Sequence, residues 1–109
     1  MITNESLSEM ADLDALKAKH GEIFALATDD AEIIIRKPTR TEYRKFLRES
    51  AETDLRAGAI EDLVRAVVLV PDAQGFGAML NELPGLCEEF APHILKLAGL
   101  TGKAIVKKL

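Results

Sequence analysis

The stretch IEDLVRAVVLVPDAQGFGAMLNELPG, residues Ile60–Gly85, decides the fold of this chain. It holds a densely apolar segment, a Val-Pro-Asp break, a second apolar-patterned segment and a Leu-Pro-Gly break. In the first segment, apolar residues recur at the i, i+3, i+4, i+7 and i+8 spacing of a helix that faces a core. These residues are Ile60, Leu63, Val64, Val67 and Val68. The valine run that continues to Val70 also suits a buried strand, but the spacing and the intervening polar residues favour a helix.

The two breaks predict where successive helices end and begin. Pro71 ends the first segment, and Asp72 is placed to cap a following helix. That helix has an apolar face made of Phe76, Met79, Leu80 and Leu83. Gly75 and Gly77 lie inside it at a cost of about 1 kcal/mol each relative to alanine, so we expect close packing to require them.

Before this stretch, the sequence predicts a helix and then a hairpin. Ser6 or Ser8 is the expected cap of the helix and Gly21 its end; its apolar stripe is Leu7, Met10, Leu13 and Leu16. Residues 22–37 hold two short β-prone runs around Asp29-Asp30, typical of a hairpin. Phe24, Leu26 and Thr28 share one face of the first strand, and Ile33 and Ile35 share one face of the second. Because an isolated hairpin is marginal in water, it must lie on the helices or pair with strands from another copy of the chain.

The remaining segments also read as helices. Thr39 and Glu42 form a capping-box pattern that opens a helix after the hairpin. A helical pattern continues from Leu86 to Ala98, with Pro92 predicting a kink or a fresh start. The fold class is therefore α+β and mainly α-helical: a short N-terminal helix, a β-hairpin and a compact bundle of about four short helices. We expect a single domain over 1–109, divided into 1–21 (helix), 22–37 (hairpin), 38–99 (helical core) and 100–109 (basic tail).

Composition limits the class of protein. The 109 residues are 48% hydrophobic but include no Trp, one Tyr and four Phe, so the core must be mainly aliphatic. A single cysteine excludes an internal disulfide and a multi-cysteine zinc site, and it suits a reducing compartment. The opening MITNES lacks the features of a secretory signal, and every apolar run is far shorter than the ~20 residues of a membrane span. We expect a soluble cytoplasmic protein with no membrane partner.

The formal net charge of −4 hides alternating blocks. Residues 1–32 carry eight acidic and two basic residues, residues 36–48 six basic and one acidic, and residues 49–94 nine acidic and two basic. The last fifteen residues contain four lysines and no acid. A nucleic-acid binder is usually basic over a whole face, so this alternation favours self-association or a partner with complementary patches.

No group of residues specifies a reaction. Cys87 is the one thiol, and His20 and His93 are the two imidazoles. Cys87 and His93 are six residues apart and would lie on different faces of a continuous helix, so Cys87 reads as a small buried hydrophobe. Neither histidine has metal-ligand spacing. The expectation is a protein that is not an enzyme and has no cofactor or metal.

Arg40, Arg44 and Arg48 form an i, i+4 stripe on the helix opened by Thr39. Such a stripe can contact a nucleic-acid backbone, with binding that weakens steeply as salt rises. The alternative is a solvated face that complements the acidic first helix or a neighbouring subunit. The flanking acidic blocks favour this second interpretation.

The order of motifs resembles the small tail assembly chaperones of tailed bacteriophages and phage-derived particles. The motifs are Arg-Lys-Pro-Thr-Arg-Thr-Glu-Tyr, Leu-Val-x5-Val-Pro-Asp, Leu-Pro-Gly-Leu and Leu-Ala-Gly, at Arg36–Tyr43, Leu63–Asp72, Leu83–Leu86 and Leu97–Gly99. The resemblance covers roughly residues 21–109. All four motifs mark turns and caps, and none is a catalytic signature.

The resemblance implies a non-enzymatic, homo-oligomerising protein of the bacterial host cytoplasm. Such chaperones coat the long helical tape measure protein, keep it soluble and are absent from the mature particle. Many are also made in a longer, frameshifted form. Lys107-Lys108 is compatible with an A-rich slippery run at which that frameshift would occur.

Client binding through apolar grooves between helices suggests six contact residues. They are Leu80, Leu83, Leu86, Phe90, Leu100 and Val106. The alternative for each is a place in the ordinary core. Two further functions stay open: a small nucleic-acid-binding regulator that uses the arginine stripe, and a structural tail or head-completion protein that remains in the particle.

Overall fold

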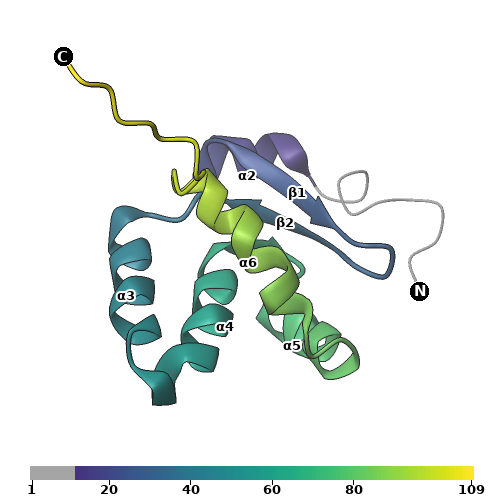
Figure 1. Ribbon diagram of the computed structural model, residues 1–109. Coiled ribbons are helices and arrows are strands. Elements are labelled where there is room, and N and C mark those ends of the chain that lie inside the picture. Colours follow the sequence, from purple (N-terminus) through teal and green to yellow (C-terminus); the bar gives the residue numbers. More distant parts are fainter. Residues whose placement is uncertain (1–11) are drawn as a thin grey trace.

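The computed structural model describes residues 12–109 and shows an α+β fold that is mainly helical (Figure 1). The predicted order of helix, hairpin and four-helix bundle is confirmed. The elements are α2 (Leu13–His20), β1 (Ile23–Ala27), β2 (Glu32–Arg36), α3 (Arg40–Ser50), the 3-10 turn η1 (Thr53–Leu55), α4 (Arg56–Val67), β3 (Val68–Val70), α5 (Ala73–Glu82) and α6 (Leu86–Leu97). Residues 100–109, called the C-terminal arm below, form no helix or strand.

The hairpin forms as the sequence predicts. Strands β1 and β2 pair antiparallel, with Phe24 opposite Ile35 and Leu26 opposite Ile33. The turn is closed by Thr28, whose N–H donates to the carbonyl of Ala31 at 2.7 Å. The Thr28 hydroxyl also accepts the amide N–H groups of the two turn residues that precede β2.

The segment predicted as one helix to Val70 is instead a helix followed by a strand. Helix α4 ends at Val67, and Val68–Val70 pairs antiparallel with β2 in a sheet of order β1-β2-β3. β-branched valines suit both structures locally, and the open edge of β2 decides in favour of the strand because pairing satisfies its backbone groups. The hairpin thus finds its third strand within the same chain.

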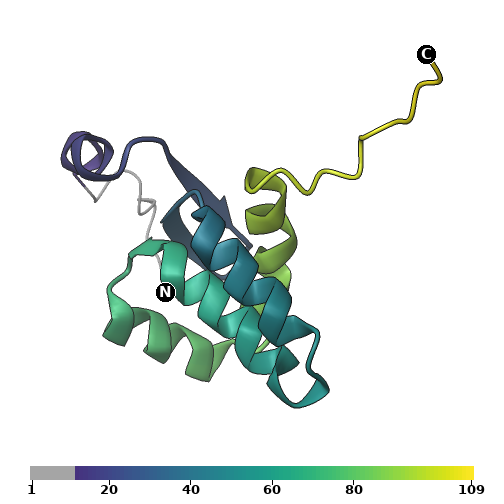
Figure 2. The ribbon, with the colours of Figure 1, turned by 90° about the vertical axis from the view of Figure 1, so that its left-hand side faces the viewer.

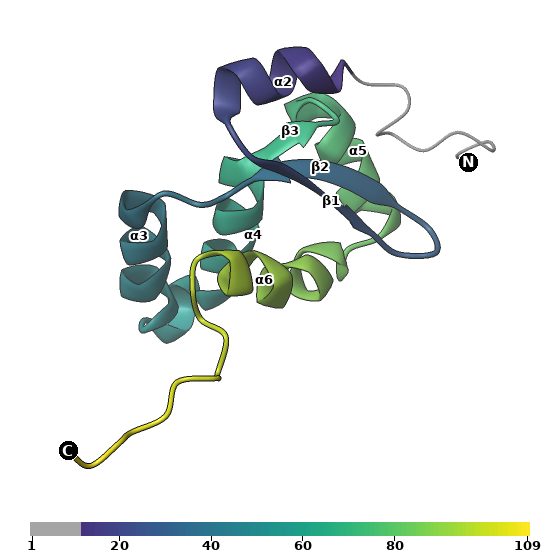
Figure 3. The ribbon, with the colours of Figure 1, turned by 90° about the horizontal axis from the view of Figure 1, so that it is seen from above.

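Strand β2 is the centre of the core. Its three consecutive isoleucines, Ile33, Ile34 and Ile35, are all at most 1% exposed, so both faces of this strand are covered. Helix α6 lies on one side of the sheet and α2 on the side away from it (Figure 3), and α4 and α5 pack with α6 around the same core. The main core cluster joins the sheet to these three helices through Ile33, Ile35, Val64, Val67, Phe76, Phe90 and Ile94.

The helix termini follow the sequence closely, with one correction. Asp72 caps α5 by accepting the N–H of Gly75 at 2.8 Å, as expected. Helix α6 runs without a break through Pro92, so no fresh start occurs there. The first described helix begins at Leu13 because Asp12 caps it through the N–H of Ala15. The expected caps Ser6 and Ser8 lie outside the described residues.

Arg36 links three elements at the end of β2. Its guanidinium donates two hydrogen bonds to Glu42 on α3, at 2.9 and 2.8 Å, and a third to the carbonyl of Ala66 on α4 at 2.7 Å. Glu42 also accepts the N–H of Thr39, and the Thr39 hydroxyl accepts the N–H of Glu42, so the predicted capping box is confirmed. Helix α3 packs beside α4 (Figure 2), and this network anchors its first turn to the sheet.

The two glycines of α5 should respond differently to alanine. A Cβ at Gly75 would lie 3.0 Å from the Pro71 Cβ and 3.1 Å from the Asp72 cap oxygen, whereas one at Gly77 meets only the Arg65 guanidinium at 3.8 Å. We expect Gly77→Ala to raise the free energy of unfolding by about 0.5–1 kcal/mol. Gly75→Ala should raise it by less, or lower it, because its Cβ is crowded. Urea denaturation measures both; an equal gain from the two variants would contradict the packing role of Gly75.

Glu42 should make stability depend on pH. Hydrogen bonding from Arg36 lowers the pKa of Glu42 from its ordinary 4.5, more than burial raises it. Its contribution is therefore present above the unfolded pKa and is lost as pH falls through the lower folded pKa. Glu42→Gln should cost about 1–2 kcal/mol of unfolding free energy at neutral pH, and the difference from wild type should shrink below about pH 4.5.

The matched control for this prediction is Glu52→Gln, since Glu52 is exposed and its side chain has no ion pair within residues 12–109. Denaturation curves between pH 3 and pH 7 compare the three proteins. A Glu42→Gln protein with the same pH profile as the control would show that the Arg36 network contributes nothing.

Candidate functional site

A groove of about 330 Å³ lies where α4, α5 and α6 meet. Gly77, Leu80, Pro84 and Cys87 supply its less polar lining, while Glu61, Arg65 and Glu88 supply charges. The remaining lining residues are Ala57 and Asn81. The Leu-Pro-Gly corner between α5 and α6 borders this hollow, so one of the breaks seen in the sequence shapes a surface feature.

Arg65 organises the charged side of this groove. Its Nε donates to Glu61 one turn earlier at 2.8 Å, and its guanidinium lies 5.6 Å from the centre of the Phe76 ring. An arginine over an aromatic face is held by cation–π attraction. A Cβ at Gly77 would make only an ordinary contact with this guanidinium, at 3.8 Å. On this side of the groove, the charges of Arg65 and Glu61 therefore partly neutralise each other.

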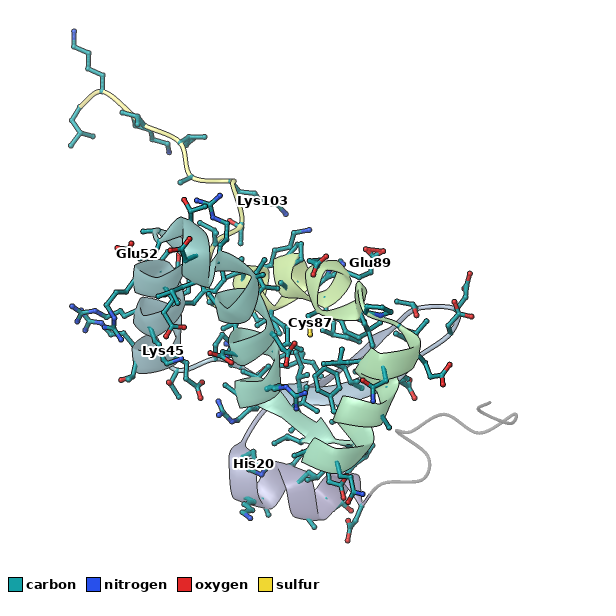
Figure 4. The ribbon with its side chains drawn as sticks, turned by 90° about the horizontal axis from the view of Figure 1, so that it is seen from below. His20, Lys45, Glu52, Cys87, Glu89 and Lys103 are labelled. Carbon is teal, nitrogen blue, oxygen red and sulfur yellow. The ribbon has the colours of Figure 1, made fainter. Side chains whose placement is uncertain are left out.

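Cys87 lies between the helices on the inner side of α6 (Figure 4) and is 3% exposed. Burial, helped by the nearby Glu61 carboxylate, raises the pKa of its thiol to about 11. The thiol therefore stays protonated at neutral pH, and a protonated thiol is a poor nucleophile. This agrees with the prediction of a buried small side chain.

The six predicted contact residues do not form one patch. Leu86 and Phe90 are buried in the core, at 5% and 2% exposure. Leu80 and Leu83 are half-buried on α5 and its C-terminal cap, packed against that core. Leu100 and Val106 are exposed on the C-terminal arm, which leaves the other end of α6 and projects from the body (Figure 1). Of the six, only Leu80 lines the α4–α5–α6 groove.

The arginine stripe is exposed along α3. Arg40, Arg44 and Arg48 make no ion pair within residues 12–109. The other basic residues of the same segment are paired: Arg36 with Glu42, Lys37 with Glu22 at 3.5 Å, and Lys45 with Glu49 and Asp62 at 3.1 and 3.4 Å. On α3 itself, Lys45 is therefore paired, and Arg40, Arg44 and Arg48 form an unpaired stripe within residues 12–109.

A second groove, of about 440 Å³, runs between β1 and α6. Leu26 and Phe90 contribute apolar lining, and Asp29 and Glu89 contribute carboxylates; Ala25, Ala27, Thr28 and His93 complete it. A third hollow, of about 400 Å³ between α3 and α4, is bordered by the Lys45 ion pairs.

Sequence reasoning identified the helices around these grooves but missed most of their lining. The sequence places Glu61 and Arg65 only among the polar residues of a helix, because the contact of α4 with α6 depends on tertiary packing. Nothing in the sequence beyond the strand pattern predicts that Ala25 and Ala27 of β1 line a groove. Arg36, Lys37 and Lys45 were recognised as basic, but their individual carboxylate partners were not.

Two classes of feature are absent from the part of the chain that the structure describes. Residues 12–109 contain no group of three or more His, Cys, Asp or Glu side chains that could hold a metal ion. None of the helices in this range is both long and apolar enough to cross a membrane.

Comparisons with known proteins give a family and a fold. No curated protein matches the chain. The structure is similar to that of an uncharacterised protein from Bacillus stearothermophilus, with a TM-score of 0.74 and 19% sequence identity over 88% of this chain and all of that one. At this identity the similarity concerns the fold alone. A family model described as a domain of unknown function (DUF6848) matches residues 16–107, and the chain therefore belongs to that family.

Proposed function

We propose that this protein is a non-enzymatic tail assembly chaperone, which binds a tape measure protein and keeps it soluble while a phage or phage-like tail assembles. The proposal begins from the sequence resemblance. The motifs that carry it coincide with structural corners: the capping box of α3, the Pro71-Asp72 link into α5, the α5–α6 corner and the end of α6. They frame a helical body, as a scaffold for holding another chain requires.

The observation that carries the proposal is the α4–α5–α6 groove. Leu80 lies in it beside Pro84, and acidic Glu61 and Glu88 stand on its walls. A helix laid in such a groove inserts apolar side chains spaced three and four residues apart. A groove this small takes one or two such side chains, so a long client would be held by many copies of the chaperone, each with a modest contact.

The walls also indicate the chemistry of the client. Glu88 has no ion pair within residues 12–109 and remains available, whereas Glu61 is already bonded to Arg65. The best-fitting client segment is an amphipathic helix with a leucine-type anchor and a lysine or arginine beside it. Charge complementarity of this kind fixes register and partner choice more than it adds affinity. The protein would act in the host cytoplasm and leave before the particle is complete.

Substitution in the groove should abolish client solubilisation. The assay is co-expression of this protein with a tape measure protein encoded by a neighbouring gene. Wild-type protein should keep this client soluble. Leu80→Asp should reduce the soluble fraction of the client about tenfold, because a carboxylate in the groove opposes the burial of an apolar anchor. Glu88→Lys, on an exposed position, should also reduce it without affecting folding. Leu47→Asp on α3, which is 47% exposed and outside the groove, is the control for an aspartate elsewhere on the surface.

Three results would contradict the proposal. These are an insoluble client with wild-type protein, equal activity of Leu80→Asp and Leu47→Asp, and presence of the protein in purified particles by mass spectrometry. The last result would instead support a structural tail or head-completion protein.

The unpaired arginine stripe favours one second candidate, a nucleic-acid-binding regulator. If Arg40, Arg44 and Arg48 contact phosphates, replacing all three by glutamine should abolish DNA or RNA binding at low salt. The logarithm of the wild-type binding constant should then fall linearly with the logarithm of salt concentration, with a slope of about −0.9 per neutralised phosphate on duplex DNA. Absence of binding at low salt would eliminate this candidate.

A further inference from the structure

The C-terminal arm carries large aliphatic side chains in water. Ile105, Val106 and Leu109 are 77%, 100% and 114% exposed. The arm follows the end of α6, where Gly99 has a φ of +103° and the N–H of Leu100 bonds back to the carbonyl of Leu95. Within residues 12–109, no hydrogen bond or ion pair joins residues 104–109 to the body of the protein.

The sequence of the arm suits an added β-strand. Residues 103–109 read KAIVKKL, with β-branched Ile105 and Val106 at the centre and Lys103, Lys107 and Lys108 around them. In an extended strand Ile105 and Val106 point to opposite faces. At about 3.3 Å per residue, the arm from Gly102 onward can span about 25 Å, more than the length of β1.

Strand β1 offers an unprotected edge. Among residues 12–109, the order β1-β2-β3 leaves one side of β1 without a strand. The N–H of Thr28 donates to Ala31 and so points toward β2. In an antiparallel pair every second residue points its N–H and C=O at the partner strand, so those of Ala25 and Ala27 point away from β2. Proteins usually blunt such an edge with a lysine, a proline or a bulge, and β1 (IFALA) has none of these. The other edge, β3, has only three residues, an irregular register and a proline immediately after it.

The groove beside this edge is complementary to the arm in both polarity and charge. The β1–α6 groove combines Leu26 and Phe90 with the carboxylates of Asp29 and Glu89. Glu89 lies on the outer side of α6, and Lys103 lies at the base of the arm (Figure 4). A strand paired with β1 would place one aliphatic residue over the groove and its lysines beside the two carboxylates.

We propose that the C-terminal arm of one copy adds as a β-strand to the open edge of β1 in a second copy, with an aliphatic side chain of the arm in the β1–α6 groove and its lysines against Asp29 and Glu89. In the structure the arm projects away from the β1–β2 turn (Figures 1 and 3). Because the arm points away from its own β1–β2 turn and its lysines complement the carboxylates of the β1–α6 groove, we take a second copy as the occupant. If two copies exchange arms, the contact closes as a symmetric dimer; if each arm reaches the next copy, it extends into a chain. This contact does not depend on the proposed function.

Sedimentation velocity of the full chain over a range of concentrations tests the proposal. Wild-type protein should self-associate, and the double variant Ile105→Asp/Val106→Asp should raise the dissociation constant about tenfold or more with unchanged thermal stability, since both side chains are exposed. Glu89→Lys should weaken association, and adding Lys107→Glu and Lys108→Glu should restore it. Glu82→Lys, an exposed acid on α5 outside the groove, is the matched control and should behave as wild type.

Single cysteines identify the two surfaces and the two copies. A Val106→Cys chain mixed with an Ala25→Cys or Ala27→Cys chain should give an oxidised dimer that contains both variants, whereas wild-type protein, whose Cys87 is buried, should give none. A monomeric wild type at every concentration would overturn the proposal. So would association that persists in Ile105→Asp/Val106→Asp, or a Val106→Cys/Ala25→Cys double variant that closes only within one chain.

Discussion

The structure depends on covering β2 on both faces and along both edges. Burying each of Ile33, Ile34 and Ile35 fully contributes about 1.5–3 kcal/mol to stability. Adjacent residues of a strand point to opposite faces, so both faces must be covered to bury all three. Strand β1 occupies one edge and β3 the other. The helices α4, α5 and α6 supply the apolar surface against which Ile33 and Ile35 pack. A central strand with a continuous apolar run thus determines where every later element must lie.

The polar end of the same strand determines where α3 lies. Arg36 follows the isoleucines directly and is only partly exposed, so its charge requires partners. It obtains them from the first turn of α3 and from a carbonyl near the end of α4. That carbonyl, on Ala66, lies just before α4 gives way to β3. The Arg36 guanidinium therefore links β2 to α3 and to the junction between α4 and β3. Since the pair is partly screened by water, it both orients these elements and contributes a modest share of the stability.

The sequence predicted the local features of this fold well and its tertiary features poorly. The capping box at Thr39, the cap at Asp72 and the turn at Asp29-Asp30 depend on residues within a few positions of one another, and all three are present. The fate of Val68–Val70 depended on β2, more than thirty residues away, and the helical spacing was misleading there. The same limit applies to the grooves, because Glu61 and Cys87 belong to one hollow only after α4 and α6 have packed. Gly75 is intermediate: a glycine inside a helix signalled a close contact, but only the structure identified Pro71 as its neighbour.

The two edges of the sheet show how this fold could combine stability with assembly. The β3 edge is short and followed by proline, a combination that discourages further pairing. The β1 edge is longer, has two exposed alanines and lies beside a groove with two carboxylates. A chain that keeps such an edge open while presenting a lysine-rich aliphatic arm has two matching surfaces of opposite charge. These surfaces lie apart from the α4–α5–α6 groove. Self-association through the first pair would therefore leave the second free, and many copies could bind one long helical partner at the same time.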